Sequence, residues 1–227
     1  MKFASYNIHG GIGRDGHFVP NRIADVLREI DADVIALQEV ESRITGFDML
    51  EFLRAQTDLI AIAGPTLVRS HGGDYGNGLL TRYPAMNVKQ LDLTVDGYEA
   101  RGALDVELDC AGHAYRVIAT HLGLHPGERR TQVKLLLREF ESDRALPTVL
   151  MGDLNEWFLW GKPMRWLHAY FEETPAPATF PAWLPVFALD RIWIKPRLFL
   201  GEIGTHRSHM AKIASDHLPI VANVVPE

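Results

Sequence analysis

The chain has 227 residues, enough for one well-packed domain, whereas two domains would each be small. Its 29 acidic and 23 basic residues give a net charge of −6, and 47% of the residues are hydrophobic, as in ordinary globular proteins. Proteins that grip duplex nucleic acid usually carry a basic face, because phosphate contacts supply much of their affinity. Nucleic acid is therefore a partner that the composition allows but does not favour.

Cysteine content and apolar runs limit the compartment. Cys110 is the only cysteine, which excludes an intrachain disulfide and a cysteine-built zinc site. The apolar stretch in the opening segment MKFASYNIHGG is too short for a secretory signal peptide. No apolar run approaches the roughly 18 residues that cross a bilayer. We therefore expect no transmembrane segment and a cytoplasmic protein.

The first third of the chain predicts alternating strands and helices. A strand over residues 2–8 ends in polar residues and a Gly-Gly turn. From Pro20 to Ile30, apolar residues recur at i, i+3, i+4 and i+7, the spacing of one helix face. Residues 33–40 form a nearly continuous apolar run, typical of a strand buried on both faces. A second helix is expected from Asp48 onward.

The remainder is richer in strands. Alternating or apolar runs predict strands over residues 78–84, 86–93, 101–109, 114–122, 148–155, 189–194 and 217–225, with helices over 126–142 and 164–171. The mixture of hairpin and crossover spacings predicts an α/β fold in which two mixed β-sheets pack face to face with helices outside. One such domain would span residues 1–227.

Polar residues that are costly to bury stand at the ends of the predicted strands. They are Asn7, Glu39, His121, Asp153 with Asn155, and Asp190, and a further cluster, Ser215-Asp216-His217, precedes the last strand. Ionised carboxylates away from water are tolerated mainly when they are paired or bind metal. Ligands also collect at strand ends in open α/β sheets. If these ends converge, they form one polar pocket.

The chemistry of such a pocket suits a hard divalent cation. Four carboxylates, two amides and two imidazoles offer mainly oxygen ligands, which select Mg²⁺ or Mn²⁺ over zinc. Side chains that do not bind the cation remain for proton transfer and charge stabilisation. Each residue alone could be an ordinary surface or turn residue. Their recurrence at six strand ends favours a site.

Seven segments, in this order, resemble the endonuclease/exonuclease/phosphatase superfamily, which includes DNase I, abasic-site endonucleases, neutral sphingomyelinases and inositol polyphosphate 5-phosphatases. They are SYNIHGG, DVIALQEV, NGLLTRYP, ATHLGL, MGDLNEW, LDRIWI and SDHLPIVANV, and they extend over almost the whole chain. The resemblance implies a DNase I-like four-layer sandwich. It also implies a Mg²⁺-dependent phosphoric ester hydrolase, with Mn²⁺ as a substitute ion.

The resemblance assigns the metal to three positions. Glu39 is implied as the principal ligand, with Asn7 beside it, and Asp216 lies near the ion directly or through water. Two cations during turnover are as compatible with the sequence as one.

The resemblance also implies catalytic roles. Asp153 would orient and deprotonate the attacking water, and Asn155 would hold the phosphoryl group. His217 would contact the phosphate and stabilise its growing negative charge, while Asp190 sets the tautomer of His217. His121 matches the family histidine near the leaving group. In-line attack on a phosphodiester needs these elements together.

Two positions bear on the substrate. Arg101 begins a strand and could bind substrate phosphate, or it could be a strand-edge charge. His9 stands where abasic-site endonucleases have an acidic residue, which weakens an assignment to DNA repair. We favour a phosphodiesterase acting on a lipid headgroup or a small phosphodiester. The alternatives are a Mg²⁺-dependent nuclease of the same superfamily, a phosphomonoesterase and a catalytically silent binding module.

The segment WFLWGKPMRWLHAYF is unusually rich in large apolar groups. Core packing under the sheet is the favoured interpretation. The alternative is an exposed shelf beside the pocket, through which Trp157 and Trp160 contact an acyl chain or a membrane surface. Arg129 and Arg130 are expected to open a helix and face solvent, or to flank the substrate.

Overall fold

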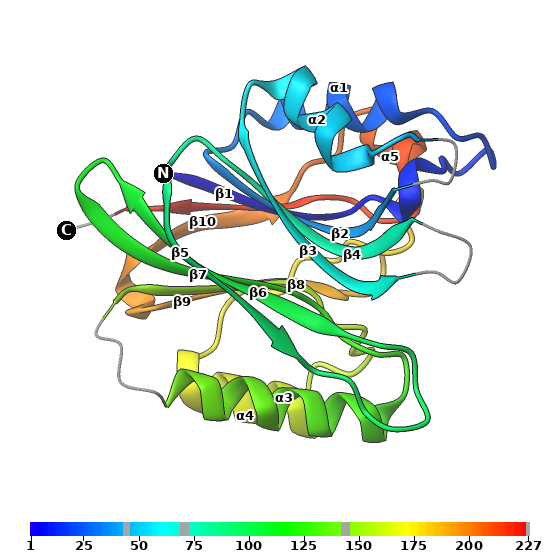
Figure 1. The fold of residues 1–227 in the computed structure, drawn as a ribbon. Coiled ribbons are helices and arrows are strands. Elements are labelled where there is room, and N and C mark those ends of the chain that lie inside the picture. Colours follow the sequence, from blue (N-terminus) through cyan, green and yellow to red (C-terminus); the bar gives the residue numbers. More distant parts are fainter. Residues whose placement is uncertain (43–45, 69–72, 142–145, 226–227) are drawn as a thin grey trace.

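Two β-sheets packed face to face, with helices on both outer faces, make up the fold (Figure 1). The computed structural model describes residues 1–42, 46–68, 73–141 and 146–225, without the side chains of 65–68. Within these ranges, no helix combines the length and apolar character needed to cross a bilayer. The four layers confirm the predicted α/β sandwich.

The first sheet contains both ends of the described chain. Its strand order is β10-β11-β1-β2-β4-β3, in which only β1 and β2 are parallel. The strands are β1 (Lys2–Asn7), β2 (Val34–Glu41), β3 (Ile60–Val68), β4 (Asp74–Thr81), β10 (Leu200–Thr205) and β11 (Ile220–Val224). Helices α1 (Pro20–Ile30), α2 (Met49–Thr57) and α5 (Ala211–Ala214) cover its outer face.

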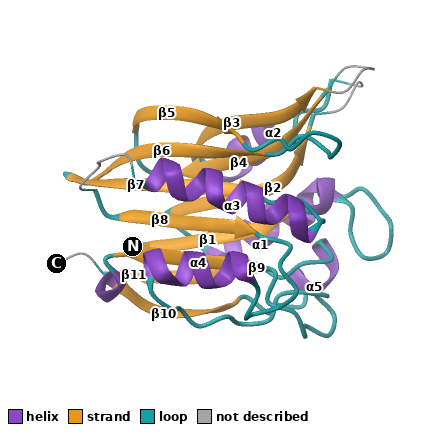
Figure 2. Ribbon diagram, turned by 90° about the horizontal axis from the view of Figure 1, so that it is seen from below, coloured by secondary structure: helices purple, strands orange, loops and turns teal. Residues whose placement is uncertain are grey.

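The second sheet is built from the middle of the chain. Its strands follow chain order, β5-β6-β7-β8-β9, and only β7 and β8 are parallel. They are β5 (Ala85–Asp92), β6 (Gly102–Cys110), β7 (His113–His121), β8 (Thr148–Asp153) and β9 (Asp190–Lys195). Helices α3 (Pro126–Phe140) and α4 (Lys162–Phe171) cover this sheet (Figure 2). Two 3-10 turns, η1 (His9–Gly11) and η2 (Arg197–Phe199), complete the elements described here.

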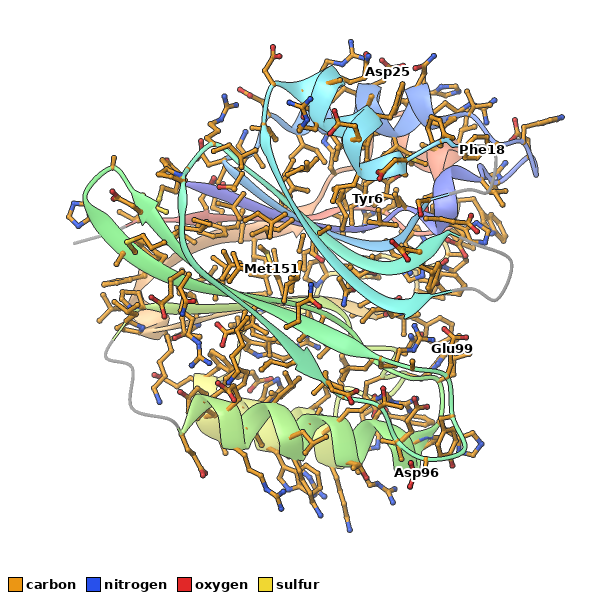
Figure 3. All side chains as sticks on the ribbon, in the orientation of Figure 1. Tyr6, Phe18, Asp25, Asp96, Glu99 and Met151 are labelled. Carbon is orange, nitrogen blue, oxygen red and sulfur yellow. The ribbon has the colours of Figure 1, made fainter. Side chains whose placement is uncertain are left out.

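Three apolar layers hold the sandwich together. The stripe of α1 that includes Ile23 and Leu27 is buried against the first sheet, as its helical spacing predicts. Leu104 and Val106 of β6 point into the layer between the sheets. Figure 3 shows Met151 in this middle layer and Tyr6 on the helix side of the first sheet. The third layer lies between the second sheet and α3 and α4.

All the helices and strands expected from the sequence are present, with shifts of a few residues at their ends. The patterns do not predict β3 and β10, which are the two edge strands of the first sheet. Gly64 and Pro65 interrupt the apolar run of β3, and Gly201 and Gly204 weaken that of β10. Such residues are tolerated at sheet edges, where fewer ladder hydrogen bonds are needed.

Strand direction brings the predicted site residues to one edge of the molecule. The carboxyl ends of β1 and β2 lie together because these strands are parallel, and the same holds for β7 and β8. Antiparallel neighbours such as β9 and β11 begin at that edge. In the second sheet, Asp153 is directly opposite His121 on one side and Asp190 on the other.

Close contact between β7 and β8 depends on Gly152. Its φ is +155°, and a Cβ built at this position would lie 1.9 Å from the Thr120 carbonyl oxygen. No side chain fits without moving one strand, and the register that places His121 beside Asp153 would move with it.

We expect Gly152→Ala to lower the free energy of unfolding by about 2–4 kcal/mol, because strand β8 must shift to relieve the clash. Equilibrium denaturation measures the change. Gly204→Ala in β10 is the matched control, since its added Cβ meets no atom within 4 Å. That variant should change stability by less than about 1 kcal/mol. Equal stability of the two variants would contradict the close approach at Gly152.

Candidate active site

The Asp153 carboxylate lies at the centre of the polar edge and is only 1% exposed. Its Oδ2 accepts a 3.0 Å hydrogen bond from Asn7 Nδ2, which comes from the other sheet. Its Oδ1 accepts the backbone N–H of Asn155 at 2.9 Å. The same Oδ2 lies 3.6 Å from His121 Nε2 and 3.7 Å from His217 Nε2. One carboxylate therefore faces two imidazoles, with its position held by donors from both sheets.

His217 is held as a cation by its neighbours. Its Nδ1 donates to Asp190 Oδ2 at 2.7 Å, and Asp190 also accepts the Thr179 hydroxyl at 2.5 Å. Burial alone would lower the pKa of His217, but the carboxylates of Asp190, Asp153 and Asp216 outweigh it and raise the pKa to about 10. The ring therefore presents a positively charged Nε2–H toward Asp153.

His121 has the opposite character. Its pKa is lowered to about 4, mainly by burial; the charge of Asp153 opposes this shift, and the charges of Arg101 and His217 add to it. Arg101 Nη1 lies 3.1 Å from His121 Nδ1, and a guanidinium can only donate. Both ring nitrogens face donors, because His121 Nε2 lies 3.0 Å from Asn155 Nδ2, which also donates to the Leu122 carbonyl oxygen.

Arg101 is not a solvent-facing strand-edge charge. Only 8% of it is exposed, and it stands one residue before β6, against His121. Its Nη2 lies 3.3 Å from the carboxylate of Glu99, which Figure 3 labels at this edge. Its Nε is buried without a partner. Contact with a substrate phosphate remains a proposal.

Glu39 lies beside Asn7 at the end of the first sheet. Its Oε1 accepts a 3.0 Å hydrogen bond from Asn7 Nδ2. Burial raises the pKa of Glu39, the Asn7 bond and His9 oppose the rise, and the charges of Asp216 and Asp153 add to it. Three carboxylates thus repel one another around one point, an arrangement that a bound cation relieves. The oxygen donors present fit Mg²⁺ or Mn²⁺.

Asp216 is the more exposed member of this group, with 39% of its side chain exposed. Its Oδ1 accepts from the Ser215 hydroxyl at 3.3 Å and lies 3.9 Å from His9 Nδ1. Ser215 also donates to the Asn7 carbonyl at 2.8 Å, which fixes the start of β11 against the end of β1. His9 thus borders the site from η1.

A second grouping of ligand-type atoms overlaps the first. Asp153, Asp190 and His217 each place one such atom within 4.8 Å of the others. We assign this grouping to hydrogen bonding, because His217 Nδ1 and Asp190 Oδ2 already bond each other at 2.7 Å. Glu39 with Asn7 and Asp216 is the better candidate for a cation site, as the sequence predicts.

The backbone at two site residues is unusual. Glu39 has φ of 57° and Asn155 has φ of 50°, the left-handed region that non-glycine residues seldom occupy. Such conformations persist only when surrounding contacts hold them, and they concentrate at functional sites. At Asn155 the contacts are with Asp153 and the Leu122 carbonyl oxygen.

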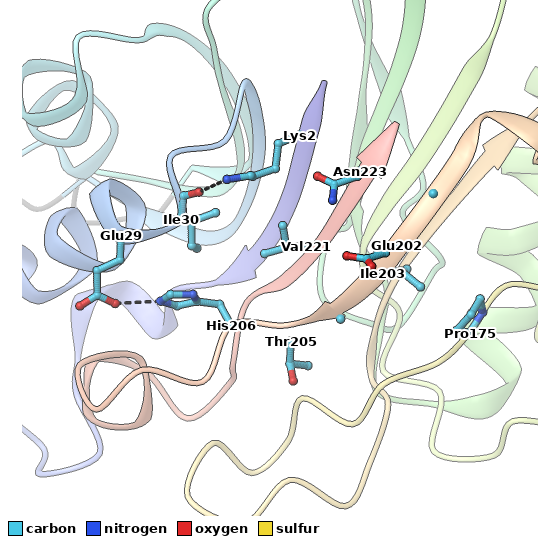
Figure 4. Close-up of a pocket in the computed structure, with 12 residues that line it drawn as sticks. Lys2, Glu29, Ile30, Pro175, Glu202, Ile203, Thr205, His206, Val221 and Asn223 are labelled. Carbon is cyan, nitrogen blue, oxygen red and sulfur yellow. Dashed lines mark hydrogen bonds and ion pairs between the residues drawn. The ribbon is translucent and has the colours of Figure 1, made fainter. Parts of the chain in front are cut away.

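Two hollows flank the site at this edge. One of about 400 Å³ is lined by Arg14, Phe180, Pro181, Trp183 and Asp216. The other, of about 350 Å³, is lined by residues of β5 and by Gly64, Thr94, Arg101 and Ala103. A third hollow of about 570 Å³ lies elsewhere, along β10 and β11, and contains the Glu29–His206 contact (Figure 4). Its lining includes none of the predicted site residues.

All nine predicted site residues therefore converge, and the structure adds others. Thr179 supports Asp190, and burial together with the charge of Glu39 raises the pKa of Tyr75 in β4. Phe180 packs on His217 with ring centroids 4.9 Å apart. None of these three belongs to a recognisable pattern in the sequence. Asn77, inside NGLLTRYP, bonds the Gly102 carbonyl across the two sheets.

Comparison with known proteins agrees with this geometry. Residues 4–217 match the Endonuclease/Exonuclease/phosphatase family. The uncharacterized protein YbhP of Escherichia coli K12 is 29% identical over 244 residues, which cover 99% of this chain and 96% of YbhP. An endonuclease/exonuclease/phosphatase from Beutenbergia cavernae has a TM-score of 0.81 at 22% identity, over 98% of this chain and 70% of that chain. A mannosyl-6-phosphatase from Bacteroides thetaiotaomicron has a TM-score of 0.76 at 18% identity, over 100% of both chains.

The chain belongs to the endonuclease/exonuclease/phosphatase family, because the match extends over most of its length. It has the phosphoesterase fold of that family, in which two mixed sheets pack between helices. The resemblance inferred from the seven sequence segments is confirmed.

The pairing of His217 with Asp190 gives a testable titration. We expect Asp190→Asn, in EDTA, to lower the pKa of His217 from about 10 toward its ordinary value of 6.5, because the largest charge that opposes burial is removed. NMR titration of the ring protons measures the shift. Asp96→Asn, at an exposed acidic residue, is the control and should leave this pKa unchanged.

The free energy of unfolding should also depend on the protonation of His217. A raised pKa stabilises the folded state fully below the ordinary value of 6.5, and this stabilisation is lost as pH rises from there to about 10. The unfolding free energy of the native protein should therefore fall across this window, and Asp190→Asn should flatten the fall. An unchanged His217 pKa in the variant would disprove the pairing.

Proposed function

We propose that this protein is a metal-dependent phosphodiesterase that hydrolyses a lipid-headgroup or small-molecule phosphodiester by in-line attack of water. The observation that carries the proposal is the buried Asp153 carboxylate, placed between a neutral and a cationic imidazole beside the acidic cluster at Glu39. This arrangement combines a proton acceptor, a fixed positive charge and a cation site in one place.

Asp153 is the general base of the proposed reaction. It orients water through Oδ2 and takes its proton as the oxygen attacks phosphorus. The Asn7 amide and the Asn155 backbone N–H hold the carboxylate in place, so little reorganisation is needed. Asn155 contributes its side chain to holding the phosphoryl group, from a backbone conformation that its hydrogen bonds maintain.

His217 and His121 have different proposed roles because one ring is cationic and the other is neutral. His217, as an imidazolium held by Asp190, donates Nε2–H toward the phosphoryl oxygens as negative charge builds on them. His121 is neutral, and the tautomer with its proton on Nε2 would donate toward the leaving oxygen. Arg101 orients that ring, and its guanidinium would contact the substrate phosphate.

Glu39, Asn7 and Asp216 are the proposed ligands of Mg²⁺, with Mn²⁺ as a substitute. A bound divalent cation would polarise a phosphoryl oxygen and neutralise the charge of the acidic cluster. Support comes from the raised pKa of Glu39, which reflects burial and two neighbouring carboxylates.

The substrate class follows from charge and from the surroundings of the site. The net charge of −6 disfavours a long polyanion, and the hollow next to Asp216 is bordered by Phe180, Pro181 and Trp183. A small phosphodiester with an apolar portion fits these walls. The mannosyl-6-phosphatase of the same fold acts on a monoester, so monoesters belong in the test.

We expect the protein to hydrolyse bis-p-nitrophenyl phosphate with Mg²⁺ or Mn²⁺ and to lose activity in EDTA. Asp153→Asn should lower kcat by at least about 100-fold, because the isosteric amide keeps the packing but cannot accept the proton. Asp96→Asn is the surface control. Near-native turnover by Asp153→Asn would show that the base lies elsewhere.

The same assay separates the substrate classes. Phospholipids, p-nitrophenyl phosphate and supercoiled plasmid are tested beside the diester. Faster turnover of phospholipid than of plasmid supports the proposal. Plasmid nicking at low enzyme concentration would assign a nuclease, and silence on every substrate with every metal would assign a binding module.

The metal assignment predicts a shifted requirement for Mg²⁺. Glu39→Gln should raise the Mg²⁺ concentration for half-maximal rate by about tenfold or more, because it removes a charged ligand and keeps its shape. Glu51→Gln, at an exposed position on α2, is the control. An unchanged Mg²⁺ requirement in Glu39→Gln would show that the ion binds elsewhere.

A further inference from the structure

Large apolar side chains gather on the surface in the segments 157–160 and 183–187, which we call the aromatic patch. Its exposed members are Trp157, Phe158, Leu159, Trp160, Trp183, Leu184, Val186 and Phe187. Trp160 is 72% exposed and Trp183 is 59% exposed. Core packing, the favoured interpretation from sequence, is therefore wrong for Trp157 and Trp160. It holds for Trp166, which packs against the layer under α3 and α4.

The aromatic patch is continuous with the site. Trp157 contacts Phe187 and Phe180 through ring centroids 4.6 and 6.0 Å apart. Phe180 in turn packs on His217, and with Trp183 it borders the hollow at Asp216. A molecule lying on the patch would thus touch the ring that covers His217.

Buried polar contacts fix the backbone of the two loops that carry the aromatic patch. Glu156 is 6% exposed, accepts Arg129 Nε at 3.3 Å and accepts the backbone N–H of Phe158 at 3.2 Å. Arg129 also donates to the carbonyl oxygens of Gly123 and Leu124, so it does not face solvent as its sequence position suggests. A backbone bridge between Phe180 and Phe187 closes the second segment. The exposed side chains therefore stand on anchored loops.

Few charged side chains occur in the segments that carry the aromatic patch. Residues 174–189 contain no charged side chain, and residues 157–165 contain only Lys162 and Arg165, both exposed. We call Lys162 and Arg165 the basic border; the acidic Asp216 lies at the adjoining hollow, and Glu172 and Glu173 precede the second segment. Tryptophan with nearby lysine and arginine is the composition that favours the interface of an anionic membrane.

We propose that the aromatic patch inserts into the surface of an anionic lipid bilayer and so brings lipid headgroups to the site. The inference rests on the proposed function, since it supplies the form in which a lipid phosphodiester arrives. A protein partner seated on the patch would cover Phe180 and the hollow at Asp216, and so obstruct the substrate. A bilayer would instead present the substrate from that side.

Vesicle co-sedimentation tests the insertion directly. The probes are phosphatidylcholine vesicles with and without phosphatidylglycerol, in EDTA so that no lipid is hydrolysed. We expect the native protein to bind the anionic vesicles, and Trp160→Ala with Leu184→Ala to weaken binding by at least about tenfold. The control pair, Met86→Ala with Leu198→Ala, removes equally exposed apolar groups far from the patch and should bind as the native protein does.

The basic border gives a second measurement. Lys162→Gln with Arg165→Gln should reduce binding to the anionic vesicles and leave binding to pure phosphatidylcholine unchanged. Failure of the native protein to sediment with either vesicle would overturn the proposal, and so would equal binding by the patch and control pairs. A native dimer that the patch pair converts to monomer would assign the surface to a second copy instead.

Turnover of the soluble diester separates this proposal from the proposed function. The Trp160→Ala, Leu184→Ala pair should keep the native kcat/KM on bis-p-nitrophenyl phosphate, because neither residue belongs to the catalytic set or lines the hollow at Asp216. Vesicle binding without any diesterase activity would refute the function and leave the insertion surface standing. Diesterase activity without vesicle binding would refute only the insertion.

Discussion

The buried carboxylate of Asp153 is the constraint on which the site depends. A charge removed from water costs several kcal/mol unless partners replace the lost solvation. Asn7 and the Asn155 backbone supply hydrogen bonds, and the His217 cation supplies opposite charge. With Asp190 also buried and His121 neutral, the positive charge of His217 does not balance the acids around it. The excess negative charge is what makes a divalent cation fit here.

His121 and His217 differ in charge because their surroundings differ. Both are almost fully buried and both face Asp153, yet their pKa values lie near 4 and near 10. Arg101 stands beside His121 and Asp190 beside His217, and this difference separates them. Groups whose pKa values are pushed apart in this way suit proton donation at one point and lasting positive charge at another.

Periodicity predicted the layers, and polar strand ends predicted that eight of the nine proposed site residues converge, because both signals are local. Arg101 was added because it resembles a family position. Edge strands β3 and β10 carry glycine or proline, so their apolar pattern is broken. Thr179 acts through one hydroxyl in an irregular segment, where no spacing marks it. The exposure of Trp160 was mispredicted for a related reason, since hydrophobicity alone does not tell an anchored loop from a core.

The chain enters the second sheet after β4 and returns to the first only at β10, so residues 85–195 build one sheet and the two flanks build the other. Asn7 bonds Asp153 across this divide, and His217 bonds Asp190. Each half alone therefore contains only part of the proposed site. A small separation of the two sheets would disrupt the proposed site while the backbone hydrogen bonds within each sheet stayed intact. Enzymatic activity would therefore report how closely the two sheets pack.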